Sequence, residues 1–247
     1  MMRYETCVFD FYGTLADIRT HEDRPELWRT MADFFRARGA DYGPEQLERA
    51  YGETVRARER QCRPLRRDVH EGHPEVQILD VFRDLYREKG VAADRTLLEQ
   101  TARIFRAAST EFLRLYPGAD RLLRDLRAQG CRLFLLSNAQ SVYTRWELKR
   151  LGLEAAFDGI YLSSDYGCKK PDRRFFEVLL HENALDPAGT VMIGNDGACD
   201  IQGAKTMGLT TIYVHSEIAP QEPLPQADFL VDPIDLEQVR RILWNNG

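Results

Sequence analysis

The chain has 247 residues, of which 43% are hydrophobic, so it can form one large domain or two unequal ones. Its formal net charge of -5 does not suit nucleic acid or an anionic membrane, and we expect neither as a partner. It has no apolar run as long as a membrane span or a secretory signal, and five widely spaced cysteines without a CxxC pair, which favours a cytoplasmic protein in a reducing compartment.

The first predicted element is a short strand over residues 4–10, which ends on an aspartate and is followed by a turn at Gly13. From about residue 22 to 112 the pattern changes to long stretches with apolar residues at helical spacing, and no convincing strand appears there. We therefore expect residues 17–112 to form a helical cap domain.

Strands and helices alternate from Tyr116 onward. Strands are predicted near residues 131–136, 159–165, 189–196 and 209–216, with an edge strand at 227–232 and helices between them. The helix after the strand at 159–165 is expected to start with Pro171 near its first turn. This alternation predicts an α/β doubly wound parallel sheet with helices on both faces. Because the strand at 4–10 fits that sheet better than the helical half, we expect a core domain of residues 1–16 and 113–247, interrupted by the cap.

Polar residues collect at the ends of four predicted strands. Because ligands of an open parallel sheet bind outside the carboxyl ends of its strands, we expect these residues to share one cleft. They are Asp10 and Thr14 after the first strand, Ser137 and Asn138 after the second, Lys170 beyond the third, and Asn195, Asp196 and Asp200 after the fourth.

The residue types in this cleft suit phosphoryl transfer. Carboxylates around a hard cation make an oxygen-ligand site for Mg²⁺, which lets a carboxylate approach an anionic phosphate. Asp10 can then act as a covalent nucleophile, and Lys170 can balance the carboxylates and hold a phosphoryl oxygen. Hydroxyl and amide donors from Thr14, Ser137 and Asn138 can bind the other oxygens of the transferred group.

Four segments, DFYGTL, LLSN, CKKPD and IGNDGACDIQGA, resemble in order the four signatures of the haloacid-dehalogenase-like hydrolases. The helical segment between the first and second signatures resembles the first type of cap in that family. The resemblance implies a Rossmann-like core and an aspartate nucleophile. It assigns the nucleophile to Asp10, substrate-oxygen binding to Thr14, Ser137 and Asn138, the lysine to Lys170, and the acidic metal site to Asp196 and Asp200.

Two positions depart from the family pattern. Phosphatases of the family usually carry an aspartate, the general acid and base, where this chain has Tyr12. The family's metal contact there is a backbone carbonyl, so Tyr12 stays among the predicted metal ligands, and its phenol could donate a proton or only line the site. Asn195 stands where many relatives have aspartate, and Asp196 beside it can take that role.

We favour a Mg²⁺-dependent phosphatase that acts on a small, anionic phosphorylated metabolite through an aspartyl-phosphate. One alternative is a metal-free 2-haloacid dehalogenase, because the resemblance to those enzymes includes the tyrosine at position 12. The other is a non-catalytic ligand-binding protein that has kept the fold. A further alternative concerns one residue: Asp200 could pair with Lys170 and never contact a metal.

Overall fold

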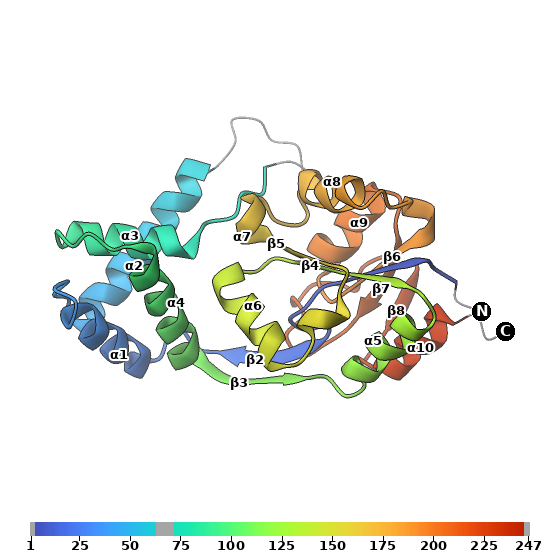
Figure 1. Cartoon of the computed structure of the whole chain (residues 1–247), viewed down its shortest axis with the longest axis horizontal. Helices are drawn as coiled ribbons and strands as arrows, with labels where there is room; N and C mark the ends of the chain where they lie inside the picture. Colours follow the sequence, from blue (N-terminus) through green and yellow to red (C-terminus); the bar gives the residue numbers. More distant parts are fainter. Residues whose placement is uncertain (1–2, 63–71, 245–247) are drawn as a thin grey trace.

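A six-stranded sheet lies beside a group of helices in the computed structural model, which describes residues 3–62 and 72–244 (Figure 1). All six strands are parallel and follow the order β5-β4-β1-β6-β7-β8. The prediction of an α/β doubly wound parallel sheet is therefore confirmed, including its edge strand. The strands are β1 (Thr6–Phe9), β4 (Arg132–Ser137), β5 (Gly159–Leu162), β6 (Thr190–Gly194), β7 (Thr210–Val214) and β8 (Phe229–Val231).

Helices cover both faces of this sheet, and its strands are therefore buried on both sides (Figure 1). Along β1, Cys7 and Phe9 join the hydrophobic cluster that contains α5 and α10, while Val8 points into the cluster that contains α8. The helices are α5 (Ala119–Ala128), α6 (Ser141–Arg150), α7 (Ser163–Tyr166), α8 (Arg173–Glu182), α9 (Gly203–Thr206) and α10 (Leu236–Leu243), with 3-10 turns at Glu154–Ala156 and Pro187–Gly189 and a π-helical segment at Gly197–Gln202.

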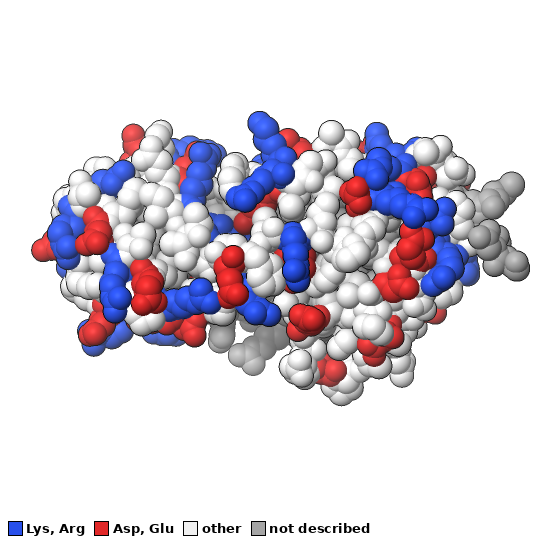
Figure 2. Space-filling model, turned by 90° about the horizontal axis from the view of Figure 1, so that it is seen from below, with Lys and Arg blue, Asp and Glu red and all other residues white. Residues whose placement is uncertain are grey.

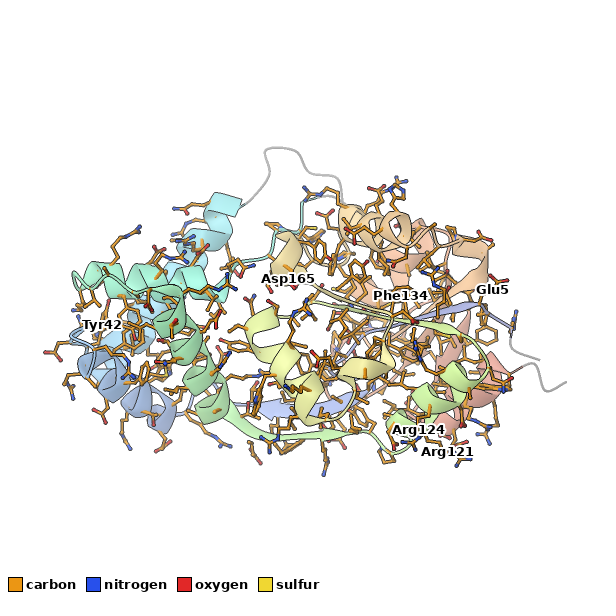
Figure 3. All side chains as sticks on the ribbon, viewed as in Figure 1. Glu5, Tyr42, Arg121, Arg124, Phe134 and Asp165 are labelled. Atoms are coloured by element: carbon orange, nitrogen blue, oxygen red, sulfur yellow. The ribbon has the colours of Figure 1, made fainter. Side chains whose placement is uncertain are left out.

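The helices of the first half pack around a hydrophobic cluster of their own. Trp28, Phe35, Phe82 and Phe105 are buried in it and contact one another through their rings. Figure 3 labels Tyr42 in this cluster and Phe134 in the sheet, in the two separate parts of the molecule. The helices are α1 (Pro25–Arg36), α2 (Pro44–Cys62), α3 (Ile78–Glu88) and α4 (Arg95–Ser109).

Two antiparallel strands, β2 (Ala16–Thr20) and β3 (Thr110–Leu115), connect the helical group to the sheet (Figure 1). The sequence analysis did not predict this two-stranded sheet, and its proposed domain boundaries fall inside both strands. The division into a core of residues 1–16 and 113–247 and a cap of residues 17–112 stays a prediction.

Two element ends near the polar cleft differ from their predicted positions. Helix α8 begins at Arg173, because the Asp172 carboxylate accepts the backbone N–H of Arg174 and so caps it, and Pro171 lies before that cap. The strand predicted over 159–165 ends at Leu162, and α7 follows directly. Both differences place polar side chains on short turns at the carboxyl edge of the sheet.

The surface carries charges of both signs. On the face shown in Figure 2, basic and acidic side chains are interspersed over both parts of the molecule. Within residues 3–62 and 72–244, no helix combines the length and the apolar character needed to cross a membrane.

Candidate active site

The candidate site lies at the carboxyl edge of the three central strands. β1 lies between β4 and β6, and Asp10 directly follows it. Ser137 ends β4 on one side, and Asn195 follows β6 on the other. The strand order therefore explains why residues more than 120 positions apart in the chain meet at one point.

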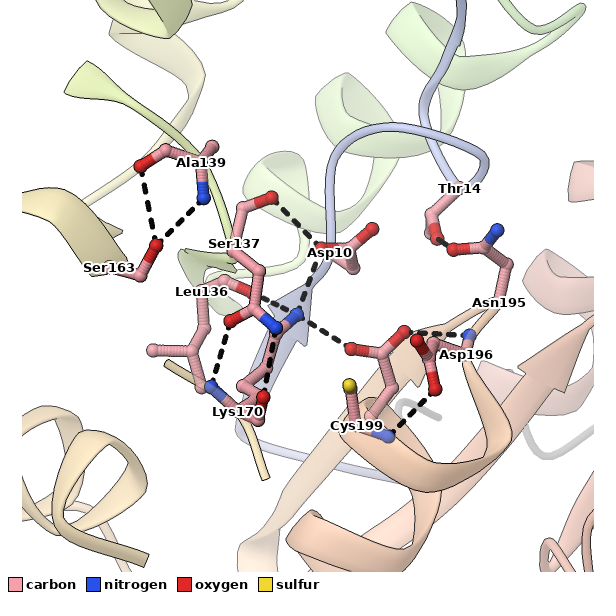
Figure 4. A network of polar contacts seen from close by, with 12 residues as sticks. Asp10, Thr14, Leu136, Ser137, Ala139, Ser163, Lys170, Asn195, Asp196 and Cys199 are labelled. Atoms are coloured by element: carbon pink, nitrogen blue, oxygen red, sulfur yellow. Dashed lines mark hydrogen bonds and ion pairs between the residues drawn. The ribbon is translucent and has the colours of Figure 1, made fainter. Parts of the chain in front are cut away.

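Lys170 connects two of the predicted acidic residues (Figure 4). Its Nζ lies 2.8 Å from Asp10 Oδ1 and 2.6 Å from Asp200 Oδ1, and it donates a third hydrogen bond to the Leu136 carbonyl at 2.7 Å. Ser137 Oγ donates to the same Asp10 oxygen at 2.9 Å. Within the described chain both of these hydrogen bonds go to Asp10 Oδ1, and Asp10 Oδ2 receives none.

Burial and neighbouring charges have opposite effects on the pKa values of Lys170 and Asp200. Lys170 is only 2% exposed. Burial alone would lower the pKa of Lys170, but the carboxylates of Asp10 and Asp200 raise it above its ordinary value. Burial also raises the pKa of Asp200, and Lys170 opposes that rise. The lysine therefore remains an ammonium between two acids.

Glycines allow the close packing around this cluster. A Cβ on Gly194 would collide with the Asp200 carboxylate. Gly13 has a φ of +84°, and a Cβ there would collide with the Asn195 amide. The first and fourth signature segments therefore require glycine at positions 13 and 194, because a side chain there would keep their polar groups apart.

Asp196 and Asp200 do different things although both were predicted as metal ligands. Asp196 Oδ1 accepts the backbone N–H groups of Ala198 and Cys199 at 2.9 and 2.7 Å, which starts the π-helical segment. Its own N–H donates to Asp200 Oδ2 at 2.9 Å (Figure 4). Asp200 thus has one oxygen on Lys170 and the other on the backbone, as in the alternative that pairs it with the lysine.

The donor set suits a hard divalent cation only with help from water or substrate. In the part of the chain that the structure describes, no three His, Cys, Asp or Glu side chains converge to hold a metal by themselves. Asp10 and Asp200 nevertheless place two carboxylates on the single ammonium of Lys170, and the Asp196 carboxylate caps the helical segment that follows β6. Mg²⁺ commonly binds through one or two carboxylates and keeps several waters, so these residues fit it.

The predicted substrate binders Thr14 and Asn138 already make hydrogen bonds within the protein. Asn138 Oδ1 accepts the Lys170 N–H at 2.8 Å, and Asn138 Nδ2 donates to the Lys170 carbonyl at 2.9 Å. Thr14 Oγ1 donates to Asn195 Oδ1 at 3.5 Å. Asn138 therefore fixes the loop that carries the lysine, and its role toward substrate stays a prediction.

Tyr12 makes contacts that the sequence analysis missed. Its hydroxyl donates to Glu147 of α6 and lies 2.9 Å from the Thr144 hydroxyl. Glu147 also accepts two hydrogen bonds from Arg106 of α4, at 2.7 and 3.3 Å. Burial, together with the charge of Glu147, raises the pKa of the Tyr12 phenol, so it keeps its proton at neutral pH. The network ties the first signature to both α4 and α6.

The burial of Glu147 reverses what its helix suggests. Glu147 is 2% exposed, whereas Trp146 beside it is 52% exposed. Sequence patterns place charged residues outside and aromatic residues inside, so they gave no signal for this contact. The tertiary positions of Tyr12 and Arg106, 135 and 41 residues earlier in the chain, explain it.

We expect Glu147→Gln to lower the free energy of unfolding by about 1–3 kcal/mol, because the mostly buried Arg106 loses the carboxylate that it hydrogen-bonds. Urea unfolding measures this change. Glu111→Gln is the matched control: Glu111 pairs with His21 and Arg24 in solvent, so the loss should be much smaller. Equal losses for the two variants would show that the buried pair has no special role.

A cavity of about 820 Å³ opens beside these residues, lined among others by Tyr12, Arg106 and Lys170. His73 and Glu75, from the segment that leads into α3, form part of its wall. Glu75 of this segment accepts a hydrogen bond from Ser163 Oγ at 2.6 Å, and its N–H donates to the Gly167 carbonyl. The cavity is therefore enclosed by residues of both the sheet and the helical group.

Residues 4–208 match the family model of the haloacid dehalogenase-like hydrolases. The chain belongs to this family. It is 38% identical to glyceraldehyde 3-phosphate phosphatase of Methanothermobacter thermautotrophicus over 111 residues. This alignment covers 44% of this chain and 49% of that protein. It is 30% identical to phosphoserine phosphatase of Thermus thermophilus over 159 residues. This alignment covers 64% of this chain and 62% of that protein. The matches thus span about half to three fifths of these relatives.

Solved structures of the haloacid dehalogenase-like family share the fold at low identity. A phosphatase of the family from Thermococcus onnurineus aligns over 97% of both chains, with a TM-score of 0.62 and 20% identity. The L-2-haloacid dehalogenase of Xanthobacter autotrophicus aligns over 99% of this chain and all of its own, with a TM-score of 0.58 and 20% identity. The fold is therefore common to phosphatases and dehalogenases and does not separate them.

Proposed function

We propose that the chain is a phosphatase that transfers the phosphoryl group of a small, anionic phosphorylated metabolite to Asp10 and then hydrolyses the aspartyl-phosphate. The observation that carries this proposal is the Lys170 ammonium, held between Asp10 and Asp200 at the wall of the cavity. The names of two curated relatives, both phosphatases, support phosphatase over dehalogenase.

The residues divide the work of phosphoryl transfer between them. Ser137 and Lys170 both bind Asp10 Oδ1, which orients the carboxylate and leaves Oδ2 to attack phosphorus. We assign Thr14, Ser137 and Asn138 to the oxygens of the transferred group, as the family signatures imply. Water then attacks phosphorus in the aspartyl-phosphate and restores the carboxylate.

We propose Mg²⁺ as the cofactor, held by the Asp10 carboxylate, the Tyr12 backbone carbonyl and one or both of Asp196 and Asp200. When bound, it would neutralise the phosphate and the charge that develops during transfer. A relative of the same fold, the hydrolase YfnB of Bacillus subtilis (24% identity, TM-score 0.55, 98% of this chain and 99% of that one), has been solved with magnesium.

We also propose a reducing, cytoplasmic location. The Cys131 thiol donates to Cys7 Sγ at 3.5 Å with no disulfide between them, and Cys168 and Cys199 are free as well. A close pair of free thiols is typical of a compartment that keeps cysteines reduced.

Chelation provides the test of this function. We expect the enzyme to hydrolyse members of a panel of phosphate esters, to lose that activity in EDTA, and to regain it with added Mg²⁺. The carboxylates of the site outnumber the Lys170 ammonium. An anionic phosphate therefore cannot approach Asp10 unless a metal cation is bound as well. Hydrolysis untouched by EDTA would contradict the metal requirement.

Tyr12 favours a second candidate, the metal-free 2-haloacid dehalogenase, because displacement of halide from carbon needs no proton donor. Release of chloride from 2-chloropropionate with no phosphatase activity would establish it. Binding of phosphate esters without turnover, unchanged in Asp10→Asn, would instead indicate a non-catalytic binding protein.

A further inference from the structure

The groups around Asp10 carry several hydrogens that could protonate a leaving group, and each is already donated within the protein. Ser137 Oγ donates to Asp10, and Lys170 directs its three N–H groups to Asp10, Asp200 and the Leu136 carbonyl. Using any of them for the leaving group would break the arrangement that orients the nucleophile.

Tyr12 is committed in the same way. Its hydroxyl hydrogen is donated to Glu147, whose carboxylate also accepts two hydrogen bonds from the Arg106 guanidinium. A carboxylate paired with a guanidinium has no proton of its own to pass on. Thr14, the next hydroxyl along the chain, donates to Asn195. Among the described residues, the hydroxyl and ammonium groups nearest to Asp10 are thus all donated to other protein groups.

We infer that this site takes phosphates whose leaving group departs as a stable anion without being protonated: acyl phosphates, aryl phosphates or phosphoanhydrides. The inference rests on the proposed phosphatase function and narrows its substrate class. Protonation by a positioned acid contributes about 10²–10⁴-fold to such a step, so its absence should penalise alkyl esters by a similar factor.

The step balances without a proton donor. Asp10 Oδ2 forms a bond to phosphorus, the bond from phosphorus to the leaving oxygen breaks, and its electron pair departs with that oxygen as a carboxylate, phenolate or phosphate. Water then forms a bond to phosphorus, the bond to Asp10 breaks and returns the carboxylate, and one proton is released to solvent with the inorganic phosphate.

The test compares kcat/KM of the full chain with Mg²⁺ across three arms: acetyl phosphate, a series of aryl phosphates of graded phenol acidity, and pyrophosphate. Phosphoserine and glyceraldehyde 3-phosphate serve as alkyl esters. We expect kcat/KM to fall steeply as the leaving group becomes more basic, with alkyl esters at least about 100-fold below phenyl phosphate. The arm with the highest kcat/KM identifies which acidic leaving group the cavity accepts.

Two variants locate the cause. We expect Tyr12→Asp, which introduces a carboxyl acid, to raise kcat/KM for alkyl esters by about 100-fold and to change acetyl phosphate much less. Tyr12→Phe keeps the ring and removes the hydroxyl, so the ratio between aryl and alkyl esters should stay the same.

A flat dependence on the leaving group in the unmodified enzyme would overturn the inference while leaving the phosphatase function intact. It would mean that a donor exists, either Tyr12 or a more distant cavity residue such as His73 or Lys169. A loss confined to alkyl esters in Tyr12→Phe or His73→Gln would identify that donor. If none of the compounds were hydrolysed, both the proposed phosphatase function and this inference would be wrong.

Discussion

Asp10→Asn is expected to lower kcat for phosphate esters by at least about 10⁴-fold, because the amide cannot form the covalent intermediate. Asparagine keeps the shape of the side chain and one oxygen that can accept from Ser137 and Lys170. The variant should therefore fold, and its loss of activity should be a loss of chemistry. Steady-state kinetics measures the rate, and quenching the unmodified enzyme during turnover should trap a phosphorylated aspartate that the variant lacks.

Asp158→Asn is the matched control for this experiment. The Asp158 carboxylate accepts the Leu133 N–H at 2.7 Å and a hydrogen bond from Arg127 at 2.6 Å, near the start of β4 and so at the opposite edge of the sheet from Asp10. Its replacement should cost stability and leave turnover intact. If both variants kept comparable activity, a nucleophile other than Asp10 would have to be sought.

The sheet and the cluster at its edge could be predicted because their signals are local. Each strand is a short apolar run that ends on a polar residue, and the parallel order brings those ends together. The sequence therefore predicts that Asp10, Ser137 and Lys170 lie together, including the contact between Lys170 and Asp10. The pairing of Asp200 with Lys170 was one of the predicted alternatives, whereas the capping role of Asp196 was not predicted, because it depends on a π-helical segment that no sequence pattern indicated.

The contacts between the helical group and the sheet could not be predicted. The Tyr12–Glu147–Arg106 network joins residues more than 130 positions apart, and it buries a glutamate beside an exposed tryptophan. Strands β2 and β3 were missed as well, because a two-stranded ribbon with one exposed side has no continuous apolar run. Both features are set by tertiary packing, which periodicity along one element does not encode.

Lys170→Met is expected to lower the free energy of unfolding by about 3–5 kcal/mol and to abolish turnover. The reason is electrostatic: the substitution leaves the Asp10 and Asp200 carboxylates facing each other in a buried site without their shared cation. Chemical denaturation in the absence of metal measures the stability. Lys169→Met is the control for stability, since Lys169 is less buried than Lys170 and its backbone N–H, which the substitution keeps, donates to the His73 carbonyl.

The double variant Lys170→Met with Asp200→Asn separates charge balance from the lost hydrogen bonds. If uncompensated negative charge causes the instability, removing one carboxylate should recover part of the stability, and the double variant should be more stable than Lys170→Met alone. If the lost hydrogen bonds cause it, the two substitutions should add. Activity should stay absent in either case, because neither substitution restores the cation that holds Asp10 ready to attack.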